Sequence, residues 1–187
     1  MATVATKKKS KKGMRIVLTA LFICIALLLA LLLWLLLISP GTPPPLVDQD
    51  GKVPEHGINE KIWVTIGGIE QGMFIRGMDT DNPVLLFLHG GPGMPEFVFD
   101  QIYHTGLEEM FTVCWWEQRG AGLSYNGGIQ PETVTVDRVI LDTLEVANYL
   151  KQRFGKDKIY LMAHSGARSL AYRLRQKRRS CFMHTLA

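Results

Sequence analysis

The chemistry of this sequence centres on Ser165, a serine that follows a short apolar segment and has small residues beside it. Residues 158–162, Lys-Ile-Tyr-Leu-Met, are typical of a short buried strand, and Ala-His-Ser-Gly follows at 163–166. A serine hydroxyl is a poor nucleophile unless the fold presents it to a base and to a pocket that stabilises an anion. A sharp turn from strand to helix provides that presentation. The pattern predicts a nucleophile turn, with Ala163 and Ala167 standing where glycine is usual.

A glycine-rich loop lies earlier in the chain, directly after another apolar segment. Residues 84–88, Val-Leu-Leu-Phe-Leu, are apolar throughout, which predicts a strand buried on both faces. They lead into His-Gly-Gly-Pro-Gly at 89–93, whose glycines leave backbone N–H groups without side-chain cover and so suit an anion. The loop is not a phosphate loop, because no Gly-Lys-Ser or Gly-Lys-Thr follows it. The alternative is a tight turn that merely requires glycine.

Three further segments predict strands that would hold these loops. Residues 58–66 and 71–76 indicate two antiparallel strands joined through Gly67-Gly68, because polar and apolar residues alternate within them. Residues 111–116, Phe-Thr-Val-Cys-Trp-Trp, indicate another apolar strand.

A polar loop and a helix complete the pattern between the strands. The loop at 117–124 contains Arg119, which is either a substrate ligand or, as we favour, a structural residue that ties loops together. Apolar residues then recur at helical spacing from Thr135, a suitable N-cap, to Gly155. Strands that alternate with helices predict an α/β fold with a mainly parallel sheet.

Three motifs stand in order, each directly after a strand: 89–93, the loop Glu-Gln-Arg-Gly-Ala-Gly-Leu-Ser at 117–124, and 163–166. Together they resemble the α/β-hydrolase fold, and specifically the proline iminopeptidase family of serine peptidases. The resemblance covers about residues 58–166. It implies part of an α/β-hydrolase sheet, in which an antiparallel hairpin precedes parallel strands with helices.

The resemblance also implies roles for individual residues. Ser165 would be the nucleophile, and the N–H groups of Gly166 and of Gly91, or alternatively Gly90, would form the oxyanion hole. His89 would order the loop rather than act as the base. At position 117 a glutamate stands where the family usually has aspartate.

The implied activity is release of N-terminal residues from peptides through an acyl-enzyme at Ser165, without a cofactor or a metal. A small peptide or an ester would be the substrate, and esterase-like hydrolysis is the alternative activity. In this fold the carboxylate and the histidine base follow the serine. After Ser165 the sequence has His184, which nothing positions, and no Asp or Glu. We therefore expect a truncated chain that lacks both groups and is inactive.

The N-terminal part of the chain predicts a membrane anchor. Residues 1–15 are basic, and 16–38 form an uncharged apolar run of about 23 residues, long enough for a helix to cross a bilayer. The run ends in Leu-Ile-Ser-Pro rather than an Ala-x-Ala site, which favours an uncleaved signal anchor. Positive charge stays cytoplasmic, so we place the N-terminus inside and the hydrolase domain outside the cell membrane. The proline-rich residues 39–57 form a stiff stalk between them.

Residues 167–187 are difficult to reconcile with the fold, because they carry six basic residues and no acid. They should begin with the helix behind the nucleophile turn, where burying Arg168 unpaired would be costly. A helix lying on an anionic membrane and a nucleic-acid tail are two alternatives. A third hypothesis is a single-base deletion after the codon of Gly166, since restoring one base allows an apolar helix in the other frame. A chain that stops here also predicts an open, apolar edge on the strand before Ser165.

The charge distribution limits the remaining function classes. Between the two basic ends, the body of the chain has nine Lys and Arg against seventeen Asp and Glu, which argues against a nucleic-acid surface on the domain. The three cysteines, Cys24, Cys114 and Cys181, have no disulfide or metal-site spacing. A non-catalytic membrane protein with a surface-binding tail is the alternative from outside the enzymes.

Overall fold

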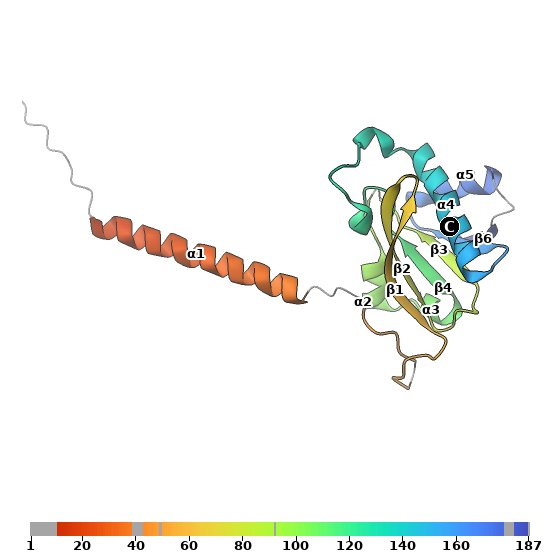
Figure 1. The fold of residues 1–187 in the computed structure, drawn as a ribbon, viewed down its shortest axis with the longest axis horizontal. Coiled ribbons are helices and arrows are strands. Elements are labelled where there is room, and N and C mark those ends of the chain that lie inside the picture. The colour runs from red at the N-terminus through yellow and green to blue at the C-terminus, as the bar shows by residue number, and fades with distance from the viewer. Residues whose placement is uncertain (1–10, 39–42, 49, 92, 178–181, 187) are drawn as a thin grey trace, which may run out of the picture. The chain divides into compact units, whose positions relative to one another are not determined.

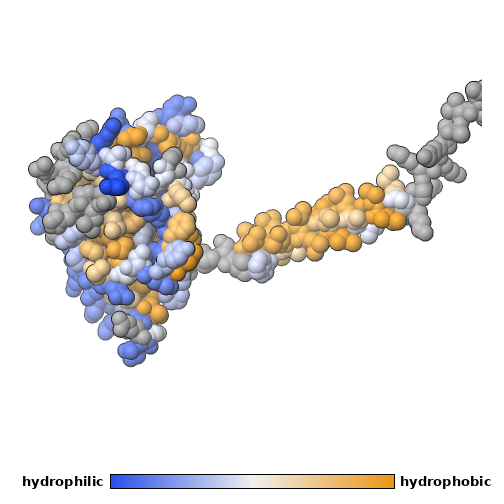
Figure 2. Space-filling model, turned by 180° about the vertical axis from the view of Figure 1, so that it is seen from behind, coloured by the Kyte–Doolittle hydropathy of each residue, from blue (hydrophilic) through white to orange (hydrophobic). Residues whose placement is uncertain are grey.

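The computed structural model describes residues 11–38, 43–48, 50–91, 93–177 and 182–186, and the chain divides into two units, residues 1–41 and 42–187. The described residues of the first unit form the helix α1 (Lys11–Ile38). Its segment Gly13–Leu37 is long and apolar enough to span a membrane, and Figure 2 shows the hydrophobic surface that runs along it. The predicted apolar helix is confirmed, and its insertion in a membrane stays a prediction.

The second unit is built on a six-stranded mixed sheet, in the order β1-β2-β4-β3-β5-β6 (Figure 1). The strands are β1 (Ile58–Ile66), β2 (Ile69–Gly77), β3 (Val84–Leu88), β4 (Thr112–Trp116), β5 (Ile159–Ala163) and β6 (Phe182–Leu186). The pairs β1–β2 and β2–β4 are antiparallel, and β4, β3, β5 and β6 run parallel. Gly67 and Gly68 both have positive φ, as a tight hairpin turn requires. The predicted hairpin and the strands after it are confirmed.

Helices cover the two faces of this sheet. On one face, α4 (Val136–Phe154) and α5 (Ala167–Lys177) pack against the buried side chains of the strands. On the other face lie α2 (Phe97–Tyr103) and α3 (Leu107–Met110), and Phe97 joins a smaller buried cluster. Two short 3₁₀ turns, Gly122–Ser124 and Pro131–Thr133, connect β4 to α4. All five residues of β3 are buried, because successive side chains enter the two cores in turn.

The predicted ends of α4 are also confirmed. The Thr135 hydroxyl accepts a hydrogen bond of 3.2 Å from the backbone N–H of Arg138, which satisfies one of the free donors in the first turn. Gly155 ends the helix in the left-handed conformation, with φ of 61°. Residues at the two ends of α4 therefore determine where this helix begins and ends.

The end of the chain differs from two expectations. The helix α5 follows the turn as predicted. Of its basic side chains that the structure describes, Arg168 and Arg173 are exposed and carry no burial cost, while Leu170 and Leu174 enter the core. The predicted open edge on the strand before Ser165 is wrong, because β6 pairs with β5 in parallel. The hypothesis of a single-base deletion stays a prediction that nucleotide sequence decides.

Candidate functional site

Ser165 lies in the turn between β5 and α5, and its backbone has φ of +51°. This left-handed conformation is uncommon for a residue with a side chain. The backbone N–H groups of Ala167 and Arg168 donate to the carbonyls of His164 and Ser165, each at 3.1 Å, and so close the turn. The Ser165 side chain is exposed. The strand, the strained serine and the helix thus have the geometry that the sequence pattern predicts for a nucleophile turn.

The glycine-rich loop after β3 lies directly against this turn. A β-carbon at Gly90 would be 2.9 Å from Cβ of Ser165, and one at Gly166 would be 2.7 Å from the carbonyl oxygen of Gly91. Neither position can accept a larger residue without movement of the backbone. Among the described residues, the N–H groups of Gly91 and Gly166 have no intramolecular acceptor. Two free donors therefore lie beside the serine, on the two segments that the sequence singles out.

His89 orders the start of the loop, which agrees with the role expected for it. Its Nε2 accepts a hydrogen bond of 3.0 Å from the backbone N–H of Gln118, and its Nδ1 lies 3.0 Å from the carbonyl oxygen of Gly90. The side-chain amide of Gln118 donates to the His89 carbonyl, also at 3.0 Å. Burial lowers the pKa of His89. A neutral ring suits this arrangement, because Nε2 must accept while Nδ1 donates.

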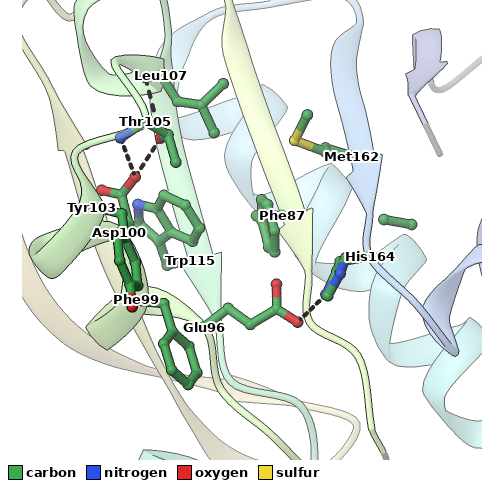
Figure 3. A pocket seen from close by; sticks show the side chains of 11 residues that line it. Phe87, Glu96, Phe99, Asp100, Tyr103, Thr105, Leu107, Trp115, Met162 and His164 are labelled. Atoms are coloured by element: carbon green, nitrogen blue, oxygen red, sulfur yellow. Dashed lines mark hydrogen bonds and ion pairs between the residues drawn. The ribbon is translucent and has the colours of Figure 1, made fainter.

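Glu96 is a site residue that the sequence analysis missed. Its Oε1 atom lies 2.6 Å from Nδ1 of His164, the residue before the serine, and 3.1 Å from the backbone nitrogen of Gly90. Figure 3 shows the Glu96 side chain extending toward His164, with Phe99 beside it. The sequence gives no signal for this contact, because Glu96 and His164 are 68 residues apart; the structure shows that Glu96 stands at the N-cap of α2 without a side-chain capping bond.

Two other polar residues of the loops are structural. Arg119 donates to the buried carboxylate of Asp142 and to the carbonyl of Gly67, so it ties the loop after β4 to α4 and to the β1–β2 turn. This confirms the structural alternative for Arg119. The Glu117 carboxylate accepts from the backbone N–H of Leu123 and supports the same loop. Burial raises the pKa of Glu117.

Two cavities flank the turn. One, of about 400 Å³, is lined by the glycine-rich loop, the loop after β4 and the start of α5, including Gly91 and Gly166. The other, of about 510 Å³, is largely apolar and lies on the opposite face of the sheet, with Glu96 and His164 in its wall (Figure 3). Ser165 lines neither of these two cavities, but its neighbours His164 and Gly166 line one each.

The chain is similar to named peptidases. No family model matches it. It is 43% identical over 119 residues to the "Probable aminopeptidase YbaC" of Bacillus subtilis (strain 168), which is 64% of this chain and 37% of that protein. It is 30% identical over 114 residues to the proline iminopeptidase of Lactobacillus delbrueckii subsp. lactis, which is 61% of this chain and 37% of that protein. The chain thus spans well under half the length of these relatives.

Solved structures agree with the sequence comparison. A proline iminopeptidase-related protein from Thermus thermophilus superimposes with a TM-score of 0.57 and 30% identity, over 66% of this chain and 42% of that one. This chain carries part of an α/β-hydrolase fold. An epoxide hydrolase from Vigna radiata shares the fold with a TM-score of 0.56 at 22% identity, over 68% of this chain and 38% of that one.

The structure brings together two of the segments that the sequence analysis singled out. The turn at Ser165 and the glycine-rich loop lie against each other, and their roles as nucleophile and oxyanion hole stay predictions. His184 lies in β6, and its side chain is outside the described residues, as is Cys181. Within the described part of the chain, no group of three or more His, Cys, Asp or Glu could hold a metal ion. The arrangement can present a hydroxyl and two N–H donors to a carbonyl group.

Proposed function

We propose that residues 58–166 are the nucleophile-bearing part of a serine hydrolase of the proline iminopeptidase type, anchored in a membrane by α1. The observation that carries the proposal is Ser165 at φ of +51° between β5 and α5, beside the N–H groups of Gly91 and Gly166, which have no acceptor among the described residues. The names of the relatives support peptides as substrates and their N-terminal residues as the part released.

The chemistry is acyl transfer. The Ser165 hydroxyl oxygen attacks the carbonyl carbon of the substrate's first residue, and the oxyanion that forms accepts hydrogen bonds from Gly91 and Gly166. Collapse of the tetrahedral intermediate breaks the bond to the leaving amine. The acyl group stays on Ser165 until water hydrolyses the ester. Both steps require a base to take the serine or water proton and an acid to return it.

The residues after Ser165 that the structure describes position no base for that proton. The sequence after Ser165 contains no Asp or Glu, and its one histidine is His184. We propose that the 187-residue chain keeps the nucleophile and the two donors but does not turn over substrate unaided. The oxyanion donors alone still favour reaction at Ser165, because in hydrolases without their triad a residual rate acceleration remains.

Chemical rescue tests both parts of the proposal. The full chain, purified in detergent, is treated with a fluorophosphonate probe with and without added imidazole, and modification of Ser165 is followed by peptide mass spectrometry. We expect very slow modification without imidazole and a clear increase with it, because free imidazole can serve as the missing base. Fast modification without imidazole would refute the proposed inactivity.

Three variants serve as references in this experiment. Ser165→Ala must lose the modified peptide entirely. Gly166→Ala places a β-carbon against the carbonyl oxygen of Gly91, so it should slow the imidazole-dependent reaction by about 100-fold, as expected for the loss of one oxyanion donor. Gly127→Ala is the matched control, because a β-carbon at Gly127 meets nothing within 4 Å. If imidazole promotes no modification of Ser165, the serine is not the nucleophile.

A further inference from the structure

Glu96 is a partly buried carboxylate that bridges the glycine-rich loop and the nucleophile turn. One oxygen, Oε1, meets both Nδ1 of His164 and the backbone nitrogen of Gly90. Because an ionised carboxylate can only accept, both nitrogen atoms donate to it, and His164 carries its ring hydrogen on Nδ1. Hydrogen bonds to a charged acceptor are about twice as strong as neutral ones. A single oxygen atom of Glu96 therefore contacts both the glycine-rich loop and His164, which lies 68 residues further along the chain than Glu96.

The side chain of Glu96 serves these segments instead of its own helix. Glu96 occupies the N-cap of α2, where Ser, Thr, Asp and Asn are preferred because their side chains reach the free N–H groups of the first turn. No such capping bond is made. The carboxylate turns away from α2 and toward the residue that precedes Ser165 (Figure 3).

This contact decides which loop glycine can bind an anion. The N–H of Gly90 already donates to Glu96, and the carbonyl of Gly90 faces Nδ1 of His89, so both sides of this residue are engaged. Among the described residues, the N–H of Gly91 has no such acceptor, and neither has that of Gly166. A donor that stabilises an oxyanion has to be free before the charge develops.

We propose that Glu96 is a positioning residue, which holds the loop against the turn and occupies the Gly90 N–H, so that Gly91 and Gly166 supply the oxyanion donors. The inference rests on the proposed function of Ser165. The sequence analysis left Gly91 and Gly90 as alternative oxyanion donors in the loop. The contact of Glu96 with Gly90 selects Gly91.

Amide exchange tests the contact without any need for activity. In NMR spectra of the full chain in detergent micelles, the Gly90 amide should exchange slowly and the Gly91 amide quickly. Glu96→Ala should speed Gly90 exchange by about 10- to 100-fold, as the net strength of a hydrogen bond to a charged group implies. Glu96→Gln keeps an acceptor oxygen of the same reach, so it should restore part of the protection. Glu109→Ala, an exposed glutamate on α3, is the control and should change nothing.

Labelling of Ser165 in the presence of imidazole tests the positioning role. Glu96→Ala should slow it by about tenfold or more, and Glu96→Gln by less. His164→Ala should resemble Glu96→Ala, and the double variant should be no slower than Glu96→Ala alone, because both changes break the same contact. If His164→Ala alone abolishes labelling while Glu96→Ala does not, His164 acts as a base and the inference is wrong.

The two readouts separate the ways in which the inference can fail. An unprotected Gly90 amide in the wild type, or equal exchange in wild type and Glu96→Ala, overturns the contact itself. Protection of Gly90 together with no labelling of Ser165 supports the contact and refutes the proposed function. Should Glu96→Ala lower the unfolding temperature too far for measurement, the isosteric Glu96→Gln variant provides the comparison.

Discussion

At the residue scale, His89 shows how burial fixes a protonation state that the loop depends on. The ring accepts the Gln118 N–H through Nε2, and protonation of that nitrogen would turn the acceptor into a second donor. Burial lowers the pKa of His89 by disfavouring the charged imidazolium. The unfolded chain, whose histidine titrates near its ordinary value of about 6.5, therefore binds the proton first as the pH falls.

This difference predicts a pH-dependent stability. The stabilisation that neutral His89 gives to the folded state is complete above about pH 6.5. It is lost as the pH falls from there toward the lower pKa of the folded state, and the free energy of unfolding then changes by at most about 1.4 kcal/mol per pH unit. In His89→Gln, whose amide oxygen can replace Nε2 as acceptor, the free energy of unfolding should fall less steeply. Urea unfolding between pH 5 and 7.5, followed by tryptophan fluorescence, measures this slope.

The control for this measurement is His56→Gln, because His56 is exposed. That variant should keep the slope of the wild type. Identical slopes for His89→Gln and the wild type would show that His89 does not hold its neutral state in the fold.

At the element scale, one buried carboxylate attaches α4 to the sheet. Asp142 accepts from Arg119 at 2.9 Å, from the side chain of Gln71 in β2 at 2.9 Å, and from Arg138 one turn earlier on α4 at 2.7 Å. The side chain of Asp142 is fully buried. The nitrogen of Trp116 in β4 donates to Gln71, so the network reaches a second strand. It fixes α4 and the loop after β4 at the same end of the sheet as the nucleophile turn.

Removal of the Asp142 charge should strongly destabilise the fold. Asp142→Asn leaves the buried guanidinium of Arg119 without its counter-ion, and we expect a loss of about 3 to 5 kcal/mol in the free energy of unfolding. The exposed Asp137, 4.0 Å from Arg173 on α5, is the matched control, and Asp137→Asn should cost less than about 1 kcal/mol. Urea denaturation of the two variants measures both. Equal effects would mean that the network does not attach α4.

At the scale of the whole molecule, two units with different surfaces are joined in one chain. The segment Gly13–Leu37 has a mean hydropathy of 3.2 and no buried side chains, whereas the second unit has its own core on both faces of the sheet. A surface of this kind is stable in a bilayer and costly in water. The membrane anchor is therefore a prediction from composition, independent of the hydrolase site.

Flotation in a density gradient tests the anchor. The full chain should float with lipid vesicles after an alkaline carbonate wash, because an inserted helix is not removed by loss of surface charge interactions. Deletion of residues 16–38 should leave the protein in the soluble or pelleted fractions, and only the lipid-bound fraction floats. A deletion variant that floats like the full chain would place the membrane contact elsewhere, for example in α5.

The sequence by itself determined the features that depend on neighbouring residues. The apolar helix, the boundaries of β1 to β5 within one or two residues, and the cap of α4 at Thr135 follow from periodicity and from hydrogen bonds within a few positions, whereas β6 was not predicted. The left-handed turn at Ser165 is local in the same sense, since a strand, a serine and small residues specify it. The residues that determine each of these features lie within a short stretch of the sequence.

Only the tertiary structure decided the contacts between loops. Glu96 reaches His164 and the Gly90 N–H because β3 and β5 lie side by side. Their pairing brings segments that are far apart in sequence to the same end of the sheet. The exposure of Arg168 depends on which face of α5 the sheet buries, and the pairing of β6 with β5 closes an edge that the sequence left open. Such contacts have no periodic signal, because their partners are set by the packing of the whole sheet.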